Sequence, residues 1–213
     1  MFITFEGIEG CGKTTQIRRL VRNLEKRGIA CKATLEPGGT EVGKKIRKIL
    51  LDSRNKGLTP LAELMLYEAD RAQHVEEVIK PALSQGLWVL SDRFFDATVV
   101  YQGFARGQDG KLIKVLNEKA TQGLVPDRTF LLDCPVRTGL ARATARNNKG
   151  QDRFEREKLA FHKKVREGYL ESARKERKRY VVVDAAQSVG DLEKEILESM
   201  RPLFPPGRGK QSA

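Results

Sequence analysis

The segment Phe2-Ile3-Thr4-Phe5-Glu6-Gly7-Ile8-Glu9-Gly10-Cys11-Gly12-Lys13-Thr14 organises the rest of this chain. Its first four residues are typical of a strand, and Gly7 to Thr14 fills every fixed position of the pattern G-x-x-x-x-G-K-[ST]. Apolar residues then recur with helical spacing as far as a glycine stop, at Ile17, Leu20, Val21 and Leu24 before Gly28. Strand, glycine loop and helix occur in the order that a phosphate-binding loop requires.

The glycine loop predicts a site for a nucleotide and Mg²⁺. Gly7, Gly10 and Gly12 tolerate positive φ, so backbone N–H groups can turn inward on phosphate oxygens at the positive end of a helix. We expect the Lys13 ammonium to reach the terminal phosphates and the Thr14 hydroxyl to hold Mg²⁺. Such a loop alone leaves motors, GTPases, helicases and small-molecule kinases open.

Size and cysteine content favour one intracellular domain. A chain of 213 residues can bury a core as a single α/β domain, which we place at 1–204 with a flexible tail at 205–213. Its three cysteines are odd in number and are not spaced as metal ligands, which favours a reducing, cytoplasmic setting. The sequence shows no secretion signal and no long apolar run, so we expect no membrane partner.

The net charge of +12 suggests nucleic acid at first, but its distribution argues against it. The segment 135–179 carries 15 Lys and Arg against 6 Asp and Glu, a local excess of 9. These cations are not interleaved with aromatic residues as a platform for single strands would be. We therefore expect no stable nucleic-acid partner, and a DNA-stimulated ATPase remains the alternative of a different class.

Short apolar runs alternate with helical segments along the chain. Strands are predicted at Ala30 to Leu35, Leu87 to Leu90, Phe130 to Asp133 and Tyr180 to Asp184, in addition to the first strand. This alternation predicts a five-stranded parallel sheet with helices on both faces and ligands beyond the carboxyl ends of the strands. The acidic residues at those ends are Glu6, Glu36, Asp92 and Asp133.

Helical patterns fill the segments between the strands. They predict helices at Glu41 to Leu51, from Pro60 towards Val78 with a kink or restart at Pro81, and at Val189 to Leu203. Another helix ends at Arg146, and a polar, cationic break separates it from a helix that restarts near Glu155. We interpret the segment at about 142–154 as a mobile lid.

The pair Asp92-Arg93 favours a phosphorylated acceptor. It follows a buried strand, so a carboxylate for the Mg²⁺ shell and a cation for an acceptor phosphate leave the sheet together. A monophosphate has a second pKa near 6, so it is largely dianionic at neutral pH and needs charge neutralisation rather than a general base. The candidate cations are Lys13, Arg93, Arg142, Arg146 and Arg153, whereas His74 and His162 are expected to be surface or packing residues.

From about Phe2 to Ala186 the chain closely resembles the thymidylate kinase (dTMP kinase) family. Beyond the glycine loop, the motifs that carry the resemblance are Glu36-Pro37-Gly38-Gly39-Thr40, Asp70-Arg71-Ala72-Gln73-His74, Ser91-Asp92-Arg93-Phe94, Tyr101-Gln102-Gly103-Phe104-Ala105-Arg106-Gly107, Pro126-Asp127 and Asp152-Arg153-Phe154-Glu155. The resemblance implies ATP-dependent phosphorylation of dTMP to dTDP in dTTP synthesis, by Mg²⁺-assisted in-line transfer without a general base. It also implies a homodimer with an interface near Glu63 to Lys80 and Thr98 to Gln102.

The resemblance also assigns roles to individual residues. It implies that Tyr67 stacks on thymine, Arg71 hydrogen-bonds the base, Thr98 contacts its edge, Arg93 holds the monophosphate and Tyr101 packs beneath the deoxyribose. The implied sets are as follows: catalytic, Lys13, Arg93, Arg153 and Glu9; ATP-binding, Gly7, Ile8, Glu9, Gly10, Cys11, Gly12, Lys13, Thr14, Thr15, Arg142 and Arg146; dTMP-binding, Glu36, Pro37, Tyr67, Arg71, Arg93, Thr98, Tyr101 and Gln102; metal, Thr14 and Asp92. Judged without the resemblance, Tyr67 also fits a core position and Arg71 a surface helix.

Two departures from the family pattern affect the details. This chain has no arginine in its glycine loop and concentrates cations in the lid, as in the subgroup whose lid supplies the arginine for the transition state. Ala97 stands where the family commonly has serine, which leaves the ranking of dTMP over dUMP open. A nucleoside kinase, with Glu36 as base for a free 5′-hydroxyl, is the alternative on the same scaffold.

Overall fold

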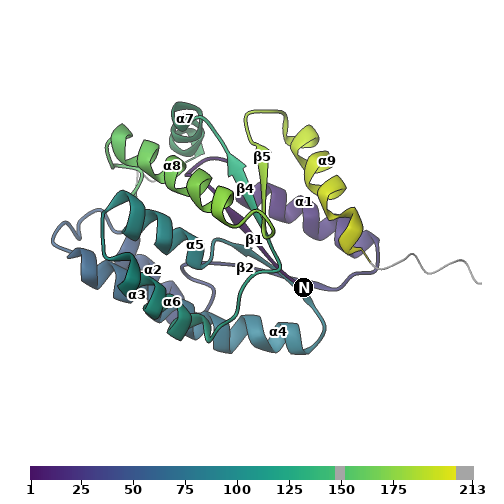
Figure 1. Ribbon diagram of the computed structural model, residues 1–213, viewed down its shortest axis with the longest axis horizontal. Coiled ribbons are helices and arrows are strands. Elements are labelled where there is room, and N and C mark those ends of the chain that lie inside the picture. Colours follow the sequence, from purple (N-terminus) through teal and green to yellow (C-terminus); the bar gives the residue numbers. More distant parts are fainter. Residues whose placement is uncertain (147–151, 205–213) are drawn as a thin grey trace, which may run out of the picture.

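A five-stranded parallel sheet forms the centre of the molecule (Figure 1). The computed structural model describes residues 1–146 and 152–204. The strands are β1 (Phe2–Glu6), β2 (Cys31–Leu35), β3 (Trp88–Asp92), β4 (Arg128–Asp133) and β5 (Tyr180–Asp184), in the order β2-β3-β1-β4-β5. All four strand pairs are parallel, which confirms the predicted fold class.

Helices cover both faces of this sheet. On one side α1 packs against α9, and on the other α8 packs against β4 and β5 while α4 packs against β3 (Figure 1). The α-helices are α1 (Lys13–Lys26), α2 (Glu41–Leu51), α3 (Pro60–His74), α4 (Lys80–Ser84), α5 (Phe95–Thr98), α6 (Gly110–Thr121), α7 (Val136–Arg146), α8 (Leu159–Lys175) and α9 (Val189–Met200). Two π-helical segments, η1 (Val75–Ile79) and η2 (Val99–Ala105), and a 3₁₀ turn, η3 (Arg201–Leu203), complete the described elements.

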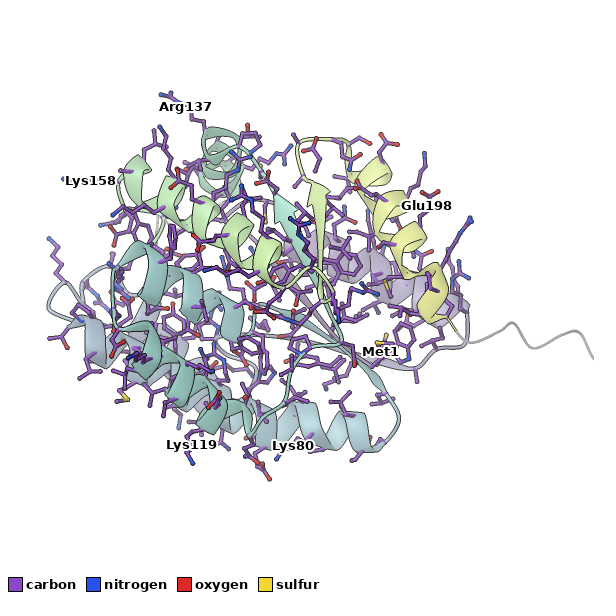
Figure 2. All side chains as sticks on the ribbon, in the orientation of Figure 1. Met1, Lys80, Lys119, Arg137, Lys158 and Glu198 are labelled. Atoms are coloured by element: carbon purple, nitrogen blue, oxygen red, sulfur yellow. The ribbon has the colours of Figure 1, made fainter. Side chains whose placement is uncertain are left out.

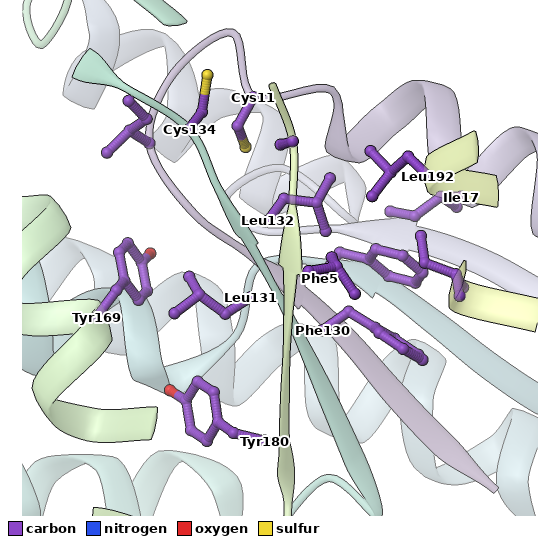
Figure 3. Close-up of a cluster of buried hydrophobic side chains, with 14 of the residues drawn as sticks. Phe5, Cys11, Ile17, Phe130, Leu131, Leu132, Cys134, Tyr169, Tyr180 and Leu192 are labelled. Atoms are coloured by element: carbon purple, nitrogen blue, oxygen red, sulfur yellow. The ribbon is translucent and has the colours of Figure 1, made fainter. Parts of the chain in front are cut away.

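The core lies on both faces of the central strands, as Figure 3 shows for β4. Phe130 lies on the side of α1 and α9, where it stacks on Phe5 with ring centroids 5.3 Å apart, whereas Leu131 faces Tyr169 on the other side (Figure 3). Charged side chains such as Lys119 and Arg137 project outward from the helices (Figure 2). Because the central strands are buried in this core, the positions of their carboxyl ends are well defined. The predicted site residues lie at and just beyond those ends.

The helix that starts at Pro60 restarts near Pro81, as the sequence predicts. It passes through the π-helical segment η1 and restarts as α4, with Pro81 in the first turn. Proline is tolerated there because the first N–H groups of a helix have no intrahelical partner. The final helix is shorter than predicted, since α9 ends at Met200 and the chain continues as the 3₁₀ turn η3.

The predicted start of the helix after the lid is wrong by about one turn. Asp152 Oδ1 accepts hydrogen bonds from the N–H groups of Phe154 and Glu155, at 2.9 Å each. This local bonding competes with helix formation, so α8 begins only at Leu159. Residues 147–151 of the lid and the predicted tail at 205–213 lie outside the described residues. Within the part described, no helix is long and apolar enough to cross a membrane.

Candidate active site

A cavity of about 490 Å³ opens at the carboxyl ends of β1, β2 and β3. Its walls come from the glycine loop, the end of β2, α3, η2 and the turn that precedes α8. Most predicted site residues line it: Glu9, Gly10, Gly12, Lys13, Thr14, Thr15, Glu36, Pro37, Tyr67, Arg71, Asp92, Arg93, Thr98, Tyr101 and Gln102. Gly7, Ile8 and Cys11 of the glycine loop, and Arg142 and Arg153, do not line it.

The glycine loop is packed so tightly that only glycine fits at its centre. Gly10 has φ of +71°, and a Cβ atom there would lie 1.9 Å from the carbonyl oxygen of Gly139 in α7. The Lys13 ammonium lies over the loop and donates hydrogen bonds to the carbonyls of Gly7 and Ile8, at 3.1 Å each. These two hydrogen bonds hold the lysine against the carbonyls of the loop.

Thr14 and Asp92 form the oxygen pair that the sequence predicts for a metal. The Thr14 hydroxyl donates to Asp92 Oδ2 at 2.7 Å, which joins the start of α1 to the end of β3. Mg²⁺ is usually held by one or two protein oxygens together with substrate phosphates and water, and this donor set fits that pattern. In the described ranges, no group of three or more His, Cys, Asp or Glu could hold a metal by itself.

Arg71 forms a rigid, buried part of the cavity wall. Its Nε atom donates to Glu36 Oε2, and Nη1 donates to Glu68 Oε1 and Thr98 Oγ1, all at 2.9 Å. Asn117 of α6 accepts a further bond from Nη1 at 2.9 Å. This burial rules out a surface position for Arg71 and fixes its guanidinium beside Thr98.

Glu36 has both carboxylate oxygens occupied. Arg71 binds Oε2, and His74 Nδ1 lies 2.8 Å from Oε1. His74 itself is fully buried, and its Nε2 atom lies 2.6 Å from the Thr34 hydroxyl. It therefore packs beneath the end of β2, in the packing role expected from the sequence. A carboxylate held in this way is poorly suited to accept a proton from a substrate hydroxyl, which disfavours the nucleoside kinase alternative.

Arg93 lies at the end of β3 with φ of +76°, which is uncommon for a residue other than glycine. Its Nη2 atom donates to Glu9 Oε1 and to the Tyr101 hydroxyl, both at 3.1 Å. Nη1 donates to the hydroxyl of Tyr169 on α8 at 3.0 Å. Backbone strain of this kind concentrates at functional sites, and here it directs the guanidinium across the cavity towards the glycine loop.

Glu6, at the end of β1, and Glu9, in the glycine loop that follows, have pKa values that are shifted in opposite directions. Burial, together with the nearby charge of Asp96, raises the pKa of Glu6 to about 8. Burial also disfavours the charged form of Glu9, but His162 and the charge of Arg93 together outweigh it and lower the pKa of Glu9 to about 2. At neutral pH the site thus holds a neutral Glu6 beneath the strand ends and a charged Glu9 in the cavity.

Residues 152–158, which precede α8 and are called the lid turn below, pack against the wall of the cavity opposite the glycine loop. Phe154 is buried and packs edge-on against Tyr67 and Tyr101, with ring centroids 6.3 and 5.7 Å away. Arg153 points away from the glycine loop: its Nε atom donates to the Leu50 carbonyl at 2.8 Å, and Nη2 lies 2.5 Å from Glu63 Oε2.

Of the other two predicted lid arginines, only Arg142 has a described side chain, and it does not line the cavity. Arg142 of α7 donates to the carbonyl of Ala185 at 2.9 Å. Arg146 ends α7, and its side chain lies outside the described residues. The structure therefore brings Glu9, Lys13, Asp92 and Arg93 to one cavity, and the described lid arginines, Arg142 and Arg153, lie outside it.

Comparisons with known proteins agree with this geometry. The family model described as thymidylate kinase matches residues 5–196. The chain belongs to the thymidylate kinase family. It is 57% identical to the thymidylate kinase of Desulfosudis oleivorans over 87% of this chain and 89% of that protein. For the thymidylate kinase of Geotalea daltonii the identity is 55%, over 89% and 91% of the two chains.

A solved structure gives the same result. The crystal structure of thymidylate kinase from Ehrlichia chaffeensis is 32% identical, with a TM-score of 0.76, over 94% of this chain and 98% of that chain. Membership of the thymidylate kinase family confirms the predicted resemblance and identifies the chain as an enzyme, a nucleotide kinase.

Several residues around this thymidylate kinase site carry no sequence signal for their role. Asn117 and Tyr169 occupy ordinary helical positions, yet they bind Arg71 and Arg93 respectively. Glu63 is buried on α3 and gathers Gln102, Arg106 and Arg153. Only the tertiary structure reveals these partners, because each lies far along the chain from the residue it contacts.

Proposed function

We propose that this chain transfers the γ-phosphoryl group of ATP to the phosphate of dTMP, which yields ADP and dTDP. The single observation that carries the proposal is the arrangement of Arg93. Its guanidinium donates a hydrogen bond to Glu9 of the glycine loop at 3.1 Å, and Arg93 directly follows Asp92, whose carboxylate accepts the hydrogen bond of Thr14. A cation in this place suits an acceptor that brings its own negative phosphate.

The donor side of the mechanism uses the glycine loop. Its N–H groups and the Lys13 ammonium would bind the β- and γ-phosphates, after Lys13 exchanges the carbonyls of Gly7 and Ile8 for phosphate oxygens. Thr14 and Asp92 would hold Mg²⁺, which neutralises phosphate charge when bound. ATP and Mg²⁺ are accordingly the proposed cofactors.

The acceptor side uses the opposite wall. Arg71 and Thr98 present fixed polar groups to a pyrimidine, and the half-buried ring of Tyr67 offers a surface for stacking. Tyr101, held by Glu9 through a bond of 2.6 Å, would pack beneath the deoxyribose. No general base is required, because the acceptor phosphate is largely ionised at neutral pH.

We also propose that the lid supplies transition-state charge and that the enzyme is a cytoplasmic homodimer. In the lid, Arg153 would leave Glu63 and reach the transferred phosphoryl group, with Arg142 and Arg146 binding the nucleotide. In support of a dimer, the neighbouring helices α2 and α3 each expose large apolar side chains: Val42, Ile49, Leu61 and Met65. Size-exclusion chromatography with light scattering tests the dimer.

An acceptor panel tests the proposed reaction. ADP release is measured by a coupled assay with ATP and Mg²⁺ in the presence of dTMP, dUMP, dCMP, dGMP or thymidine, and without acceptor. The expected result is the highest kcat/KM for dTMP, a lower value for dUMP, and background rates for thymidine. Phosphorylation of thymidine but not of dTMP would overturn the proposal in favour of a nucleoside kinase.

A further inference from the structure

His162 is an unusual buried residue beside the candidate site. It lies in the first turn of α8, directly after the lid turn, and is fully buried. Neither ring nitrogen has a hydrogen-bond partner among the described residues. A buried polar group without a partner costs about 1–3 kcal/mol, so a functional reason for its retention is expected.

The nearest charged group to His162 is a carboxylate that also has an unpaired atom. His162 Nδ1 lies 3.4 Å from Glu9 Oε2, which itself has no hydrogen-bond partner in the described ranges. The other oxygen of Glu9 accepts bonds from Tyr101 and Arg93. Arg93 and His162 therefore flank Glu9 from two sides: Arg93 donates to Oε1, whereas His162 Nδ1 lies 3.4 Å from Oε2 without forming a hydrogen bond to it.

Acceptor binding changes this balance. Under the proposed function Arg93 turns towards the acceptor phosphate, and Glu9 then loses its arginine while it remains buried. A buried carboxylate without a counter-group is strongly unfavourable. Of the groups around Glu9, His162 places its Nδ1 atom 3.4 Å from Oε2, the oxygen that has no hydrogen-bond partner among the described residues.

We propose that His162 is a positioning residue: its Nδ1–H binds Glu9 Oε2 when the acceptor phosphate draws Arg93 away. A small approach of α8 from 3.4 Å to hydrogen-bond distance completes this contact. His162 itself touches neither substrate. This inference rests on the proposed function.

Three substitutions separate this role from simple packing. Asparagine at position 162 can place its amide nitrogen near the position of Nδ1, whereas glutamine places its amide nearer to Nε2. Leucine has the branching of asparagine without a donor. The expected result is that His162→Asn keeps kcat/KM for dTMP within about threefold, while His162→Leu and His162→Gln lower it about tenfold or more. The KM for ATP should change by less than about twofold in all three variants.

A second experiment tests whether His162 acts through Glu9. In a Glu9→Gln background, His162→Leu should cause no further loss, because the carboxylate that it serves is absent. Equal loss in the Asn and Leu variants, or an undiminished loss in the Glu9→Gln background, would overturn the inference. If the leucine variant fails to fold in a thermal melt, the comparison of Asn with Gln decides the question. Absence of wild-type activity on dTMP would instead overturn the proposed function.

Discussion

The region around the glycine loop, called the corner here, and the lid turn hold their predicted catalytic cations in different ways. The corner comprises the glycine loop and the carboxyl ends of β1 and β3. In the corner, Lys13 lies over the loop and the Thr14-Asp92 pair is already formed. In the lid turn, Arg153 is bound to Glu63 and to the Leu50 carbonyl, outside the cavity. The difference indicates that the lid arginine, unlike Lys13, must exchange its present partners to take part in the reaction.

The largest expected effect concerns Arg153. Arg153→Ala should lower kcat by roughly 10³-fold and change the affinity for ATP little, because the arginine acts only in the closed state. Steady-state rates and ATP titrations measure the two quantities. Lys158→Ala is the matched control, since Lys158 is an exposed cation near the same turn (Figure 2). Unchanged turnover in a folded Arg153→Ala enzyme would mean that this arginine only fastens the lid turn to α3.

A second experiment addresses the partner that holds the arginine. Glu63→Gln removes a buried negative charge that faces both Arg106 and Arg153, so the free energy of unfolding should fall by about 3 kcal/mol. Turnover should fall far less than in Arg153→Ala, because catalysis requires the pair to separate. Urea unfolding measures stability, with the exposed Glu77→Gln on η1 as control. A loss of turnover as large as that of Arg153→Ala, in folded protein, would contradict an exchange of partners.

The third prediction concerns how Glu6, at the end of β1, makes the stability depend on pH. Unfolded Glu6 loses its proton near its ordinary pKa of 4.5, whereas the folded protein keeps it up to about pH 8. The folded state binds more protons between these values, so the unfolding free energy should fall as pH rises through them, by at most about 1.4 kcal/mol per pH unit from this group. Glu6→Gln should reduce that slope. An identical slope in the variant, measured by urea unfolding, would show that Glu6 is ionised in the fold.

The same two regions show how far the sequence could predict the site. The glycine loop is contiguous, and its conformation depends on residues such as Gly10 that need positive φ, so a local pattern identifies it. The five-stranded parallel sheet also follows from local patterns, and this prediction is confirmed, whereas the order of the strands is seen only in the structure. The roles of individual site residues stay predictions that the experiments above test.

Contacts between distant residues could not be predicted in this way. Arg153 binds the carbonyl of Leu50, and the two residues are 103 positions apart. The Asx turn at Asp152 delays α8 beyond its predicted start, because side-chain bonding replaced the first helical turn that the apolar spacing suggested. Likewise His162, which has the spacing of a packing residue, faces a buried carboxylate of the glycine loop.

The most direct test of the account is a crystal structure with dTMP, Mg²⁺ and a non-hydrolysable ATP analogue bound together. The account predicts the triphosphate on the glycine loop and the dTMP phosphate opposite it, within hydrogen-bond distance of Arg93, with Glu9 released from that arginine. Binding of the pyrimidine nucleotide elsewhere, with Arg93 still paired to Glu9, would contradict it.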